Sequence, residues 1–190
     1  MKNLILLFVL LSLAASGQVR TKNNRYLEIS GGIRDLNLNY TLNYGASLSF
    51  VSATRNKTYK RLNLGYDTFQ FNISQLGKTI PVERYFASYT IEPALVKGKK
   101  QRSYIGAEFG GGIGYESINK GSSTIDNFTI TNGSSQIVGL LIGGLNGEKF
   151  IGKGFSISLK QTLLFSPLSS IQRLTFQSSV GIKFKLSNKL

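Results

Sequence analysis

The side chains that most often carry out chemistry in proteins are scarce in this 190-residue chain. It has no histidine and no cysteine, and its nine Asp and Glu residues are spread from Glu28 to Glu148. Serine and cysteine nucleophiles are normally activated by a histidine base, and zinc sites are built largely from His and Cys ligands. The composition therefore argues against triad hydrolases and against metal sites of the His or Cys type.

The stretch GAEFGGGIGYESINKG, residues 106–121, is the one place where glycine spacing suggests a phosphate-binding loop. A dinucleotide-binding fingerprint needs G-x-G-x-x-G at the opening of a helix. Started at Gly112, that pattern would need glycine where Ser117 stands, and no helical periodicity follows. Glu108 and Glu116, on one extended strand, would lie roughly 26 Å apart, too far to form the acid pair of a two-carboxylate hydrolase with each other. The sequence does not exclude a pair with carboxylates on other strands. We expect no enzymatic activity, no cofactor and no metal.

The first residues have the layout of an export signal. Lys2 precedes the apolar run Leu4–Leu13, and small residues follow it. This layout predicts a secretory signal peptide at residues 1–17 and leaves a single domain at residues 18–190. The apolar run is shorter than the ~20 residues that a transmembrane helix needs.

The chain is strongly basic. It carries 23 Lys and Arg residues against 9 Asp and Glu residues, a formal net charge of +14. Most of the cations stand singly, and the clearest cluster comprises Lys97, Lys99, Lys100 and Arg102. Such a charge favours an acidic surface as partner. For an exported chain we expect that surface to be anionic lipid or lipopolysaccharide, and we expect no direct contact with nucleic acid.

Beyond residue 17 the hydrophobic pattern repeats every second residue, which predicts β-strands. The segment RLTFQSSVGIKFKL shows it most clearly, because apolar and polar residues alternate along it. Most of the runs are at least as long as the ~9–11 residues of a membrane-spanning strand. The pattern predicts eight strands, at residues 25–33, 43–52, 58–70, 79–92, 103–117, 134–146, 154–165 and 173–186.

The polar faces of these strands carry full charges in mid-strand, and this decides which face points inward. The five charged residues are Glu28, Arg61, Glu108, Lys160 and Lys183. Burying them in a soluble core would be costly, whereas the wet interior of an eight-stranded membrane barrel lets them pair. We therefore predict an all-β fold, an eight-stranded antiparallel up-and-down membrane β-barrel of the outer-membrane type, with these five residues in its lumen. The alternative is a soluble lipocalin-like carrier with its apolar face inward.

Four glycines of the strand at 103–117 share the inward face with Glu108: Gly106, Gly110, Gly112 and Gly114. We expect these bare positions to let Arg61, Lys160 or Lys183 reach across to Glu108, although close backbone approach is another reason for glycine in a strand. Aromatic residues near strand ends suit the two interfacial girdles of a membrane barrel. These are Tyr26, Tyr44, Tyr85, Tyr89, Tyr104, Tyr115, Phe165 and Phe184.

The connections alternate in length, as in outer-membrane barrels. If both termini are periplasmic, the long segment 118–133 is an outer loop and the basic cluster of Lys97, Lys99, Lys100 and Arg102 is a periplasmic turn. We expect this turn and this loop to bind partners.

Several segments resemble the conjugal transfer protein TraO family, which is encoded with the conjugation apparatus of Bacteroidetes-type mobile elements. YLEISGG (26–32), TIPVERYFASYTIEP (79–93) and SVGIKFKL (179–186) are similar to strands of that family. The most specific segment is GYESINKG (114–121), which looks like its GYE-x-I-N-x-G block. The resemblance implies a structural or scaffolding component of the mating apparatus at the outer membrane, with other conjugation proteins as partners and no catalytic residues. The alternative within the same fold is a general small outer-membrane barrel for surface protection or adhesion.

Overall fold

The computed structural model describes ten segments of the chain: residues 23–34, 43–54, 57–73, 78–98, 102–118, 123–125, 128–130, 133–151, 154–170 and 173–186. The expected signal peptide at residues 1–17 lies outside these segments, as do Lys99 and Lys100. Much of the loop expected at 118–133 also lies outside them. Within the described segments, no helix is long and apolar enough to span a membrane.

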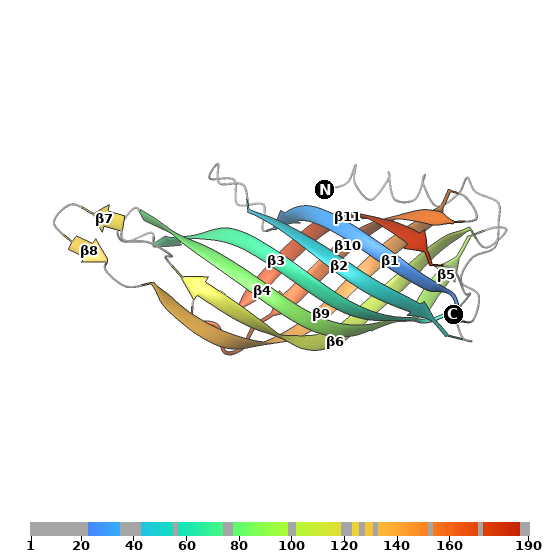
Figure 1. Cartoon of the computed structure of the whole chain (residues 1–190), viewed down its shortest axis with the longest axis horizontal. Coiled ribbons are helices and arrows are strands. Elements are labelled where there is room, and N and C mark those ends of the chain that lie inside the picture. The colour runs from blue at the N-terminus through green and yellow to red at the C-terminus, as the bar shows by residue number, and fades with distance from the viewer. Residues whose placement is uncertain are drawn as a thin grey trace.

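Eight long strands form the body of the molecule (Figure 1). They are β1 (Arg25–Arg34), β2 (Tyr44–Ala53), β3 (Tyr59–Ile73), β4 (Lys78–Glu92), β6 (Ser103–Ile118), β9 (Ser134–Phe150), β10 (Phe155–Phe165) and β11 (Leu174–Lys185). Each corresponds to one of the eight predicted segments. Three short strands were not predicted: β5 (Ala94–Lys97), β7 (Ser123–Ile125) and β8 (Phe128–Ile130).

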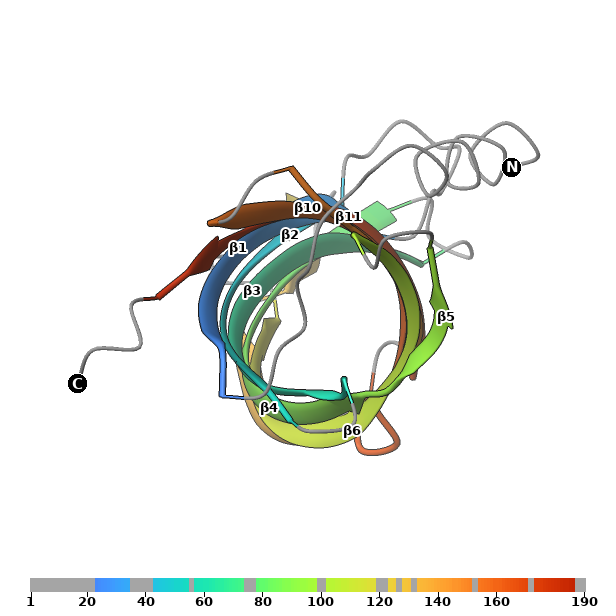
Figure 2. The same ribbon diagram turned by 90° about the vertical axis from the view of Figure 1, so that its right-hand side faces the viewer.

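Every long strand pairs antiparallel with two neighbours, so the sheet closes on itself. The order runs β4-β3-β2-β1-β11-β10-β9-β6, and β6 pairs back onto β4. The seam between the first and last strands extends in register from the pair Tyr26 and Lys185 to the pair Arg34 and Gln177. Figure 2 looks along the barrel and shows the ring of strands. The predicted eight-stranded antiparallel barrel is thus confirmed.

The two ends of the barrel differ. β1 starts and β11 ends at the same end, which we call the terminal end. The opposite end, which we call the hairpin end, carries the two-stranded β7–β8 sheet that stands away from the barrel in Figure 1. The β7–β8 hairpin lies within the long connection between β6 and β9.

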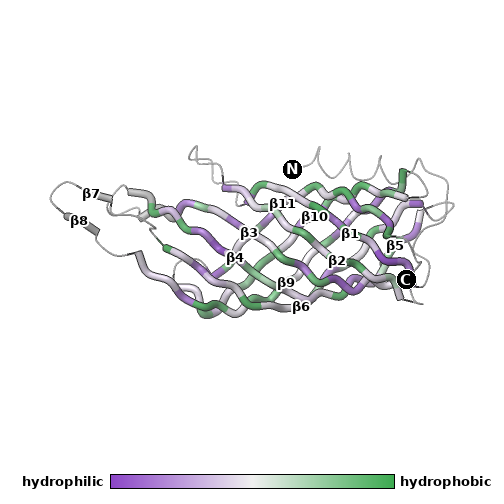
Figure 3. The backbone as a smooth tube through the Cα atoms, viewed as in Figure 1, coloured by the Kyte–Doolittle hydropathy of each residue, from purple (hydrophilic) through white to green (hydrophobic). Residues whose placement is uncertain are grey.

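The two faces of the sheet differ in polarity, and the apolar face points outward. Leu64, Ile113 and Leu141, for example, are each more than half exposed. Figure 3 shows apolar and polar positions alternating along the strands. A soluble carrier of the lipocalin kind would need the apolar face inside, so the described strands have the opposite arrangement. The arrangement is that of a barrel surrounded by lipid.

Two of the aromatic residues expected in the girdles lie inside the barrel instead. Tyr26 and Tyr104 are each only 2% exposed, and they pack with other inward-facing residues at the terminal end. The girdle prediction was wrong for this pair because Tyr26 stands two residues before the inward Glu28, and period-2 alternation puts both on one face. Tyr26 and Tyr104 belong to an apolar cluster of six residues, which we call the terminal plug: Tyr26, Val51, Ala53, Tyr59, Tyr104 and Phe150.

The other expected girdle residues, Tyr44, Tyr85, Tyr89, Tyr115, Phe165 and Phe184, are exposed on the outward face. Tyr85 is in register with Tyr66 on β3 and with Tyr115 on β6. The Tyr66 and Tyr85 rings are 5.0 Å apart between centroids. This row of three tyrosines crosses three adjacent strands, as expected for an interfacial band.

Candidate functional site: the charged barrel interior

The interior of the barrel is filled with charged side chains because the polar half of each alternating strand faces inward. Eleven charged residues are buried there among the side chains that the structure describes. They are Glu28, Arg34, Arg61, Asp67, Arg84, Glu92, Glu108, Glu116, Glu148, Lys160 and Lys183. Burial of so many charges is tolerable only where they pair and hydrogen-bond, and most of them do.

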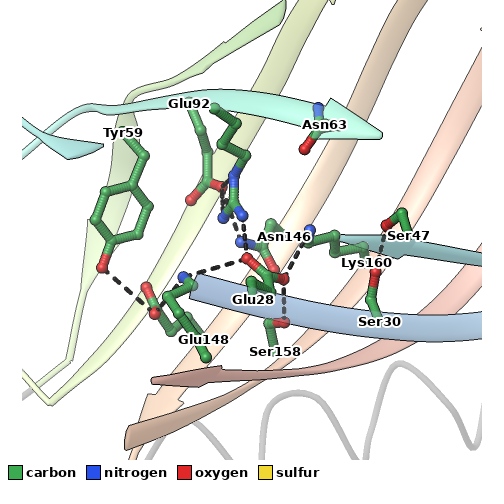
Figure 4. A network of polar contacts seen from close by, with 12 residues as sticks. Glu28, Ser30, Ser47, Tyr59, Asn63, Glu92, Asn146, Glu148, Ser158 and Lys160 are labelled. Carbon is green, nitrogen blue, oxygen red and sulfur yellow. Dashed lines mark hydrogen bonds and ion pairs between the residues drawn. The ribbon is translucent and has the colours of Figure 1, made fainter. Parts of the chain in front are cut away.

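Arg61 of β3 lies at the centre of the largest network. Figure 4 shows other members of this network, among them Glu28, Glu92 and Glu148. Its guanidinium donates to Glu92 at 3.0 Å from Nε and at 2.5 Å from a terminal nitrogen. Its other terminal nitrogen forms an ion pair with Glu28 of β1. Asn146 also donates to Glu92, at 2.8 Å. One arginine therefore links carboxylates from two different strands.

Two lysines extend this network toward the closing seam. Lys160 Nζ lies 2.7 Å from Glu28 Oε1, while Ser158 donates to the same oxygen at 2.9 Å. Lys183 Nζ lies 2.5 Å from Glu148 Oε1 and 3.8 Å from Glu28 Oε2. These contacts join β1, β9, β10 and β11 in the barrel interior.

Lys183 also connects the network to the terminal plug. Its ammonium lies 4.3 Å from the centroid of the Tyr59 ring, a cation–π geometry. The Tyr59 hydroxyl donates to Glu148 at 3.4 Å. The plug and the charge network are therefore continuous, and together they fill the terminal half of the lumen.

Two further ion pairs fill the hairpin end. Arg34 donates to Asp67 at 2.9 Å and to Thr175 at 2.7 Å, and its guanidinium lies 4.2 Å from the centroid of the Phe69 ring. Arg84 forms a second ion pair, with Glu116, to which Arg84 Nε donates at 2.7 Å.

Glu116 is hydrogen-bonded on its second oxygen as well. Gln136 donates to it at 2.8 Å and Ser169 at 3.0 Å. Ser169 lies between β10 and β11, so the connection between these strands contacts the interior. A carboxylate with this many donors is held in a fixed position.

The structure places all five of the predicted interior charges on the inward face, and each is at most 8% exposed. Four of them, Glu28, Arg61, Lys160 and Lys183, meet in one network. Glu108 does not join them: Lys160 contacts Glu28, and Glu108 accepts a hydrogen bond from Thr90 at 2.5 Å.

The glycines beside Glu108 are explained by backbone packing between strands. A Cβ added to Gly110 would lie 2.1 Å from the carbonyl oxygen of Tyr89, and one added to Gly112 would lie 2.3 Å from that of Ala87. Both carbonyls belong to β4. These two glycines therefore allow β4 and β6 to approach closely, and close approach rather than lumen space is their role.

Several interior charges were absent from the predicted cluster. Glu148 lies beyond the predicted strand end at 146, but it has the same parity as the inward Asn146, so continued alternation would have found it. Arg34 and Glu92 close their strands, where alternation alone does not say whether the barrel still surrounds the side chain.

The predicted partner-binding cations are less fully described. Lys97 is exposed at the end of β5, and Arg102 is half-buried just before β6. Lys99 and Lys100 are not among the described residues. No side-chain contact of Lys97 or Arg102 suggests a role inside the barrel.

Charge is distributed unevenly along the barrel axis. Among the described side chains, the hairpin end has three cations, Arg34, Arg84 and Arg173, and three carboxylates, Asp67, Glu83 and Glu116. The terminal end has three carboxylates, Glu28, Glu92 and Glu148, but nine cations. The nine are Arg25, Lys57, Lys60, Arg61, Lys97, Arg102, Lys149, Lys183 and Lys185. The basic excess of the described part therefore lies at the terminal end.

Several solved outer-membrane proteins share this fold. A major outer membrane protein from Thermus thermophilus is 12% identical, with a TM-score of 0.59 over 86% of this chain and 98% of that one. Ail, the attachment invasion locus protein of Yersinia pestis, is 12% identical, with a TM-score of 0.54 over 87% and 100%. OprG from Pseudomonas aeruginosa is 10% identical, with a TM-score of 0.53 over 89% and 99%. At such identities the likeness establishes the fold alone.

Sequence comparison at the level of families gives a match where comparison with single proteins does not. No curated protein matches the chain. A family model described as "Conjugative transposon protein TraO" matches residues 22–186, which is most of the chain.

Proposed function

Because the chain belongs to the conjugative transposon protein TraO family, we propose that it is an outer-membrane β-barrel component of a conjugative DNA-transfer apparatus, with a structural or scaffolding role. The observation that carries this proposal is the family match, which spans the whole barrel from before β1 to the end of β11. The outward apolar face supports a location in the outer membrane, reached through the signal peptide at residues 1–17.

The filled interior supports a scaffold rather than a pore. The terminal plug packs aromatic rings across one end, with Tyr104 and Phe150 at 6.2 Å between centroids. Behind it, the network around Arg61 links inward side chains from several strands. A barrel of eight strands has an interior just wide enough for side chains to fill. What the protein contributes to conjugation is therefore a surface, and no enzymatic step is part of the proposal.

We assign the terminal end to the periplasm and the hairpin end to the cell surface. An even number of strands returns β11 to the end where β1 starts, and outer-membrane barrels have their longer loops outside. The connection from β6 to β9, with its β7–β8 hairpin, is then an outer loop. The cation-rich terminal end faces the periplasm, where envelope-spanning components would meet it.

The proposed partner surface comprises Lys97, Lys99, Lys100 and Arg102, together with the outer loop 118–133. A basic turn fits the acidic surface of another conjugation protein, and long-range attraction would speed their encounter. Arg25, Lys60 and Lys149 occupy outward positions near the terminal ends of their strands. Lysine and arginine there suit contact with anionic lipid headgroups.

Charge reversal tests the basic turn. We expect the double variant Lys97→Glu and Arg102→Glu to lower the mating frequency by more than about tenfold, since a loss of ~1.4 kcal/mol in partner binding corresponds to that factor. The control is Arg173→Glu, which reverses an exposed cation at the hairpin end and should leave mating unchanged. Both variants should reach the outer membrane at the wild-type level, as measured by fractionation.

Two further results bear on the family-based role itself. Deletion of the gene should abolish or strongly reduce mating, and the wild-type barrel should co-purify with other conjugation proteins from detergent-solubilised envelopes. If deletion leaves mating unchanged, the role in conjugation is wrong. If deletion matters but the charge-reversed variant mates normally, only the basic turn is wrong.

A further inference from the structure

One polar pair lies on the outward face of the barrel among apolar neighbours. Gln161 of β10 and Ser178 of β11 are in register, and the Ser178 hydroxyl donates to Gln161 Oε1 at 2.8 Å. Gln161 is exposed, whereas Lys160 beside it is buried in the lumen. The other outward residues of the two strands are apolar: Phe155, Ile157, Leu159, Leu163 and Phe165 on β10, and Leu174, Phe176, Val180, Ile182 and Phe184 on β11.

The pair lies deep within the apolar band. Gln161 is six residues from Phe155 and four from Phe165, the first and last residues of β10. At ~3.4 Å per residue and a tilt of ~40°, these separations are roughly 16 Å and 10 Å along the barrel axis, within a band about 25 Å tall. Polar outward residues of other described strands lie elsewhere. Examples are Lys60 at the terminal end of β3 and Gln70 on the hairpin side of Tyr66.

Ser178 satisfies only one end of the Gln161 amide. A primary amide has a carbonyl acceptor and two N–H donors, and Ser178 contacts the carbonyl. The amide nitrogen has no hydrogen-bond partner among the described residues, and turning the amide over would only exchange the two ends. Because the hydrocarbon region of lipid offers no hydrogen bonds, a polar group left free there is costly. The outward face therefore requires an acceptor from another protein at this depth.

A second copy of this chain supplies that acceptor. Two barrels side by side in one membrane, each with the terminal end in the periplasm, are related by a twofold axis along the membrane normal. A residue beside such an axis meets its own equivalent in the other copy. Each Gln161 nitrogen then donates to the carbonyl of the other copy, whose second lone pair is not used by Ser178. The amide is thus electrostatically complementary to itself.

The strands on either side of β10 fit the same symmetry. On the β9 side, Gly139 and Gly143 face outward, and a Cβ at either would have no neighbour within 4 Å, so packing inside the barrel does not require glycine there. On the β11 side, Phe176 and Val180 are more than half exposed. A twofold axis beside β10 sets the β9 side of each copy against the β11 side of the other. Bulky side chains then meet bare backbone, which permits close approach in a membrane.

We propose that the outward face of β9, β10 and β11 is the interface of a homodimer within the membrane. The two Gln161 amides pair across its twofold axis, and the glycines of β9 receive the outward side chains of β11. The interface rests on the membrane location in the proposed function but does not depend on a role in conjugation.

Förster transfer between donor-labelled and acceptor-labelled copies of the mature barrel in phosphatidylcholine vesicles measures the association. The chain has no cysteine, so K60C gives a single labelling site on β3, the strand opposite β10 in the ring. We expect transfer above the level of random proximity, and we expect it to fall as lipid dilutes the barrels. Q161L should raise the dissociation constant on the order of tenfold, because both hydrogen bonds between the amides are lost.

Two matched controls place the effect on this face. Q70L makes the same change at an exposed glutamine of β3 and should leave the dissociation constant unchanged. G143L adds a side chain to the bare side of the interface and should weaken the dimer, whereas A46L adds bulk to the outward face of β2 and should not. Q161L should not lower the thermal unfolding midpoint of the barrel, because it removes a half-satisfied amide from lipid.

Three results would overturn the proposal. The first is wild-type transfer no greater than random proximity gives, which would leave lipid as the only cover of this face. The second is a dissociation constant that Q161L does not change, and the third is equal weakening by Q161L and Q70L, which would place the interface elsewhere. Flotation of the vesicles distinguishes the two proposals. Barrels that do not float with lipid contradict the membrane location and this interface together, whereas monomeric barrels that float contradict the interface alone.

Discussion

Arg61 is the side chain on which the interior network depends most. It extends from β3, donates to Glu92 of β4 and forms an ion pair with Glu28 of β1. Lys160 and Lys183 also contact Glu28. The guanidinium therefore belongs to a cluster of charged side chains that come from several strands. The planar, five-donor arginine fork suits this bridging role better than a lysine ammonium would.

Replacing Arg61 with methionine should therefore cost far more than the loss of one surface ion pair. Removing one partner of a buried pair typically costs ~3–5 kcal/mol, because a charge stays buried without its counterion. We expect R61M to lower the free energy of unfolding by about that amount in a urea titration of the barrel in lipid vesicles. The exposed Arg173 is the control, and R173M should change the free energy by less than ~0.5 kcal/mol.

A second variant separates lost charge pairing from lost packing. In R61M/E92Q the arginine and one of its carboxylate partners are removed together, so part of the stability should return. A double variant that is no more stable than R61M would contradict the ion-pair explanation.

At this scale the sequence identifies charges better than it identifies their partners. Alternation alone placed Glu28, Lys160 and Lys183 in the lumen, because period 2 assigns each position to a face. It could not say that Lys160 contacts Glu28 rather than Glu108, since that depends on the stagger between β1 and β10, which are not sequence neighbours. The same alternation, applied to Tyr26, would have placed that ring in the terminal plug.

At the scale of elements, the contact between β4 and β6 requires glycine at two positions of β6. Gly110 and Gly112 leave no room for a side-chain carbon because carbonyl oxygens of β4 occupy it. Gly139 and Gly143 of β9 are different: a Cβ at either would have no neighbour within 4 Å. Two adjacent strands therefore carry glycines for different reasons.

Alanine substitution distinguishes these two classes of glycine. G112A should destabilise the barrel by at least ~1–3 kcal/mol, the usual cost of overpacking, because the backbone of β4 must move. G143A should be neutral or slightly stabilising, by up to ~1 kcal/mol, because alanine restricts the unfolded chain. The readout is the temperature at which the folded band is lost on a semi-native gel. Equal behaviour of the two variants would refute the packing argument.

The sequence predicted the long strands well and the short ones not at all. Each of the eight predicted segments overlaps one observed strand, since nine or more alternating residues give a strong signal. β5 has four residues, and β7 and β8 have three each, which is too short for any period to show. β9 continues to Phe150 because its alternation runs on through Glu148 and Lys149, which lie beyond the strand end predicted at residue 146.

At the scale of the whole molecule, the barrel is inverted relative to a soluble protein. Its charged residues are inside, and side chains such as Leu141 and Ile137 are 57% and 74% exposed. The fold class followed from one fact about the sequence, which is that the polar face of each strand carries charges in mid-strand. How the interior is filled did not follow, because it depends on the tilt and stagger of all eight strands together.

An arginine scan of the outward face tests this arrangement. L141R places a cation within the apolar band of β9 and should cost ~2–4 kcal/mol in a bilayer, whereas I151R, just beyond the terminal end of β9, should cost ~0–1 kcal/mol. The measurement is reversible unfolding in lipid vesicles. A water-soluble barrel would tolerate both substitutions, so two equally small effects would argue against membrane embedding.

The seam between β1 and β11 has a consequence for the order of folding. It joins residues from opposite ends of the chain, such as Glu28 and Lys183, whereas each of the other seams in the ring joins long strands that follow one another. The entropic cost of closing a loop grows with its length, so this seam should form last, after the final strand is available. Until then the acidic and basic side chains of the future lumen remain hydrated. We therefore expect the ion pairs that cross this seam, such as Lys183 with Glu28, to form in a late step of folding.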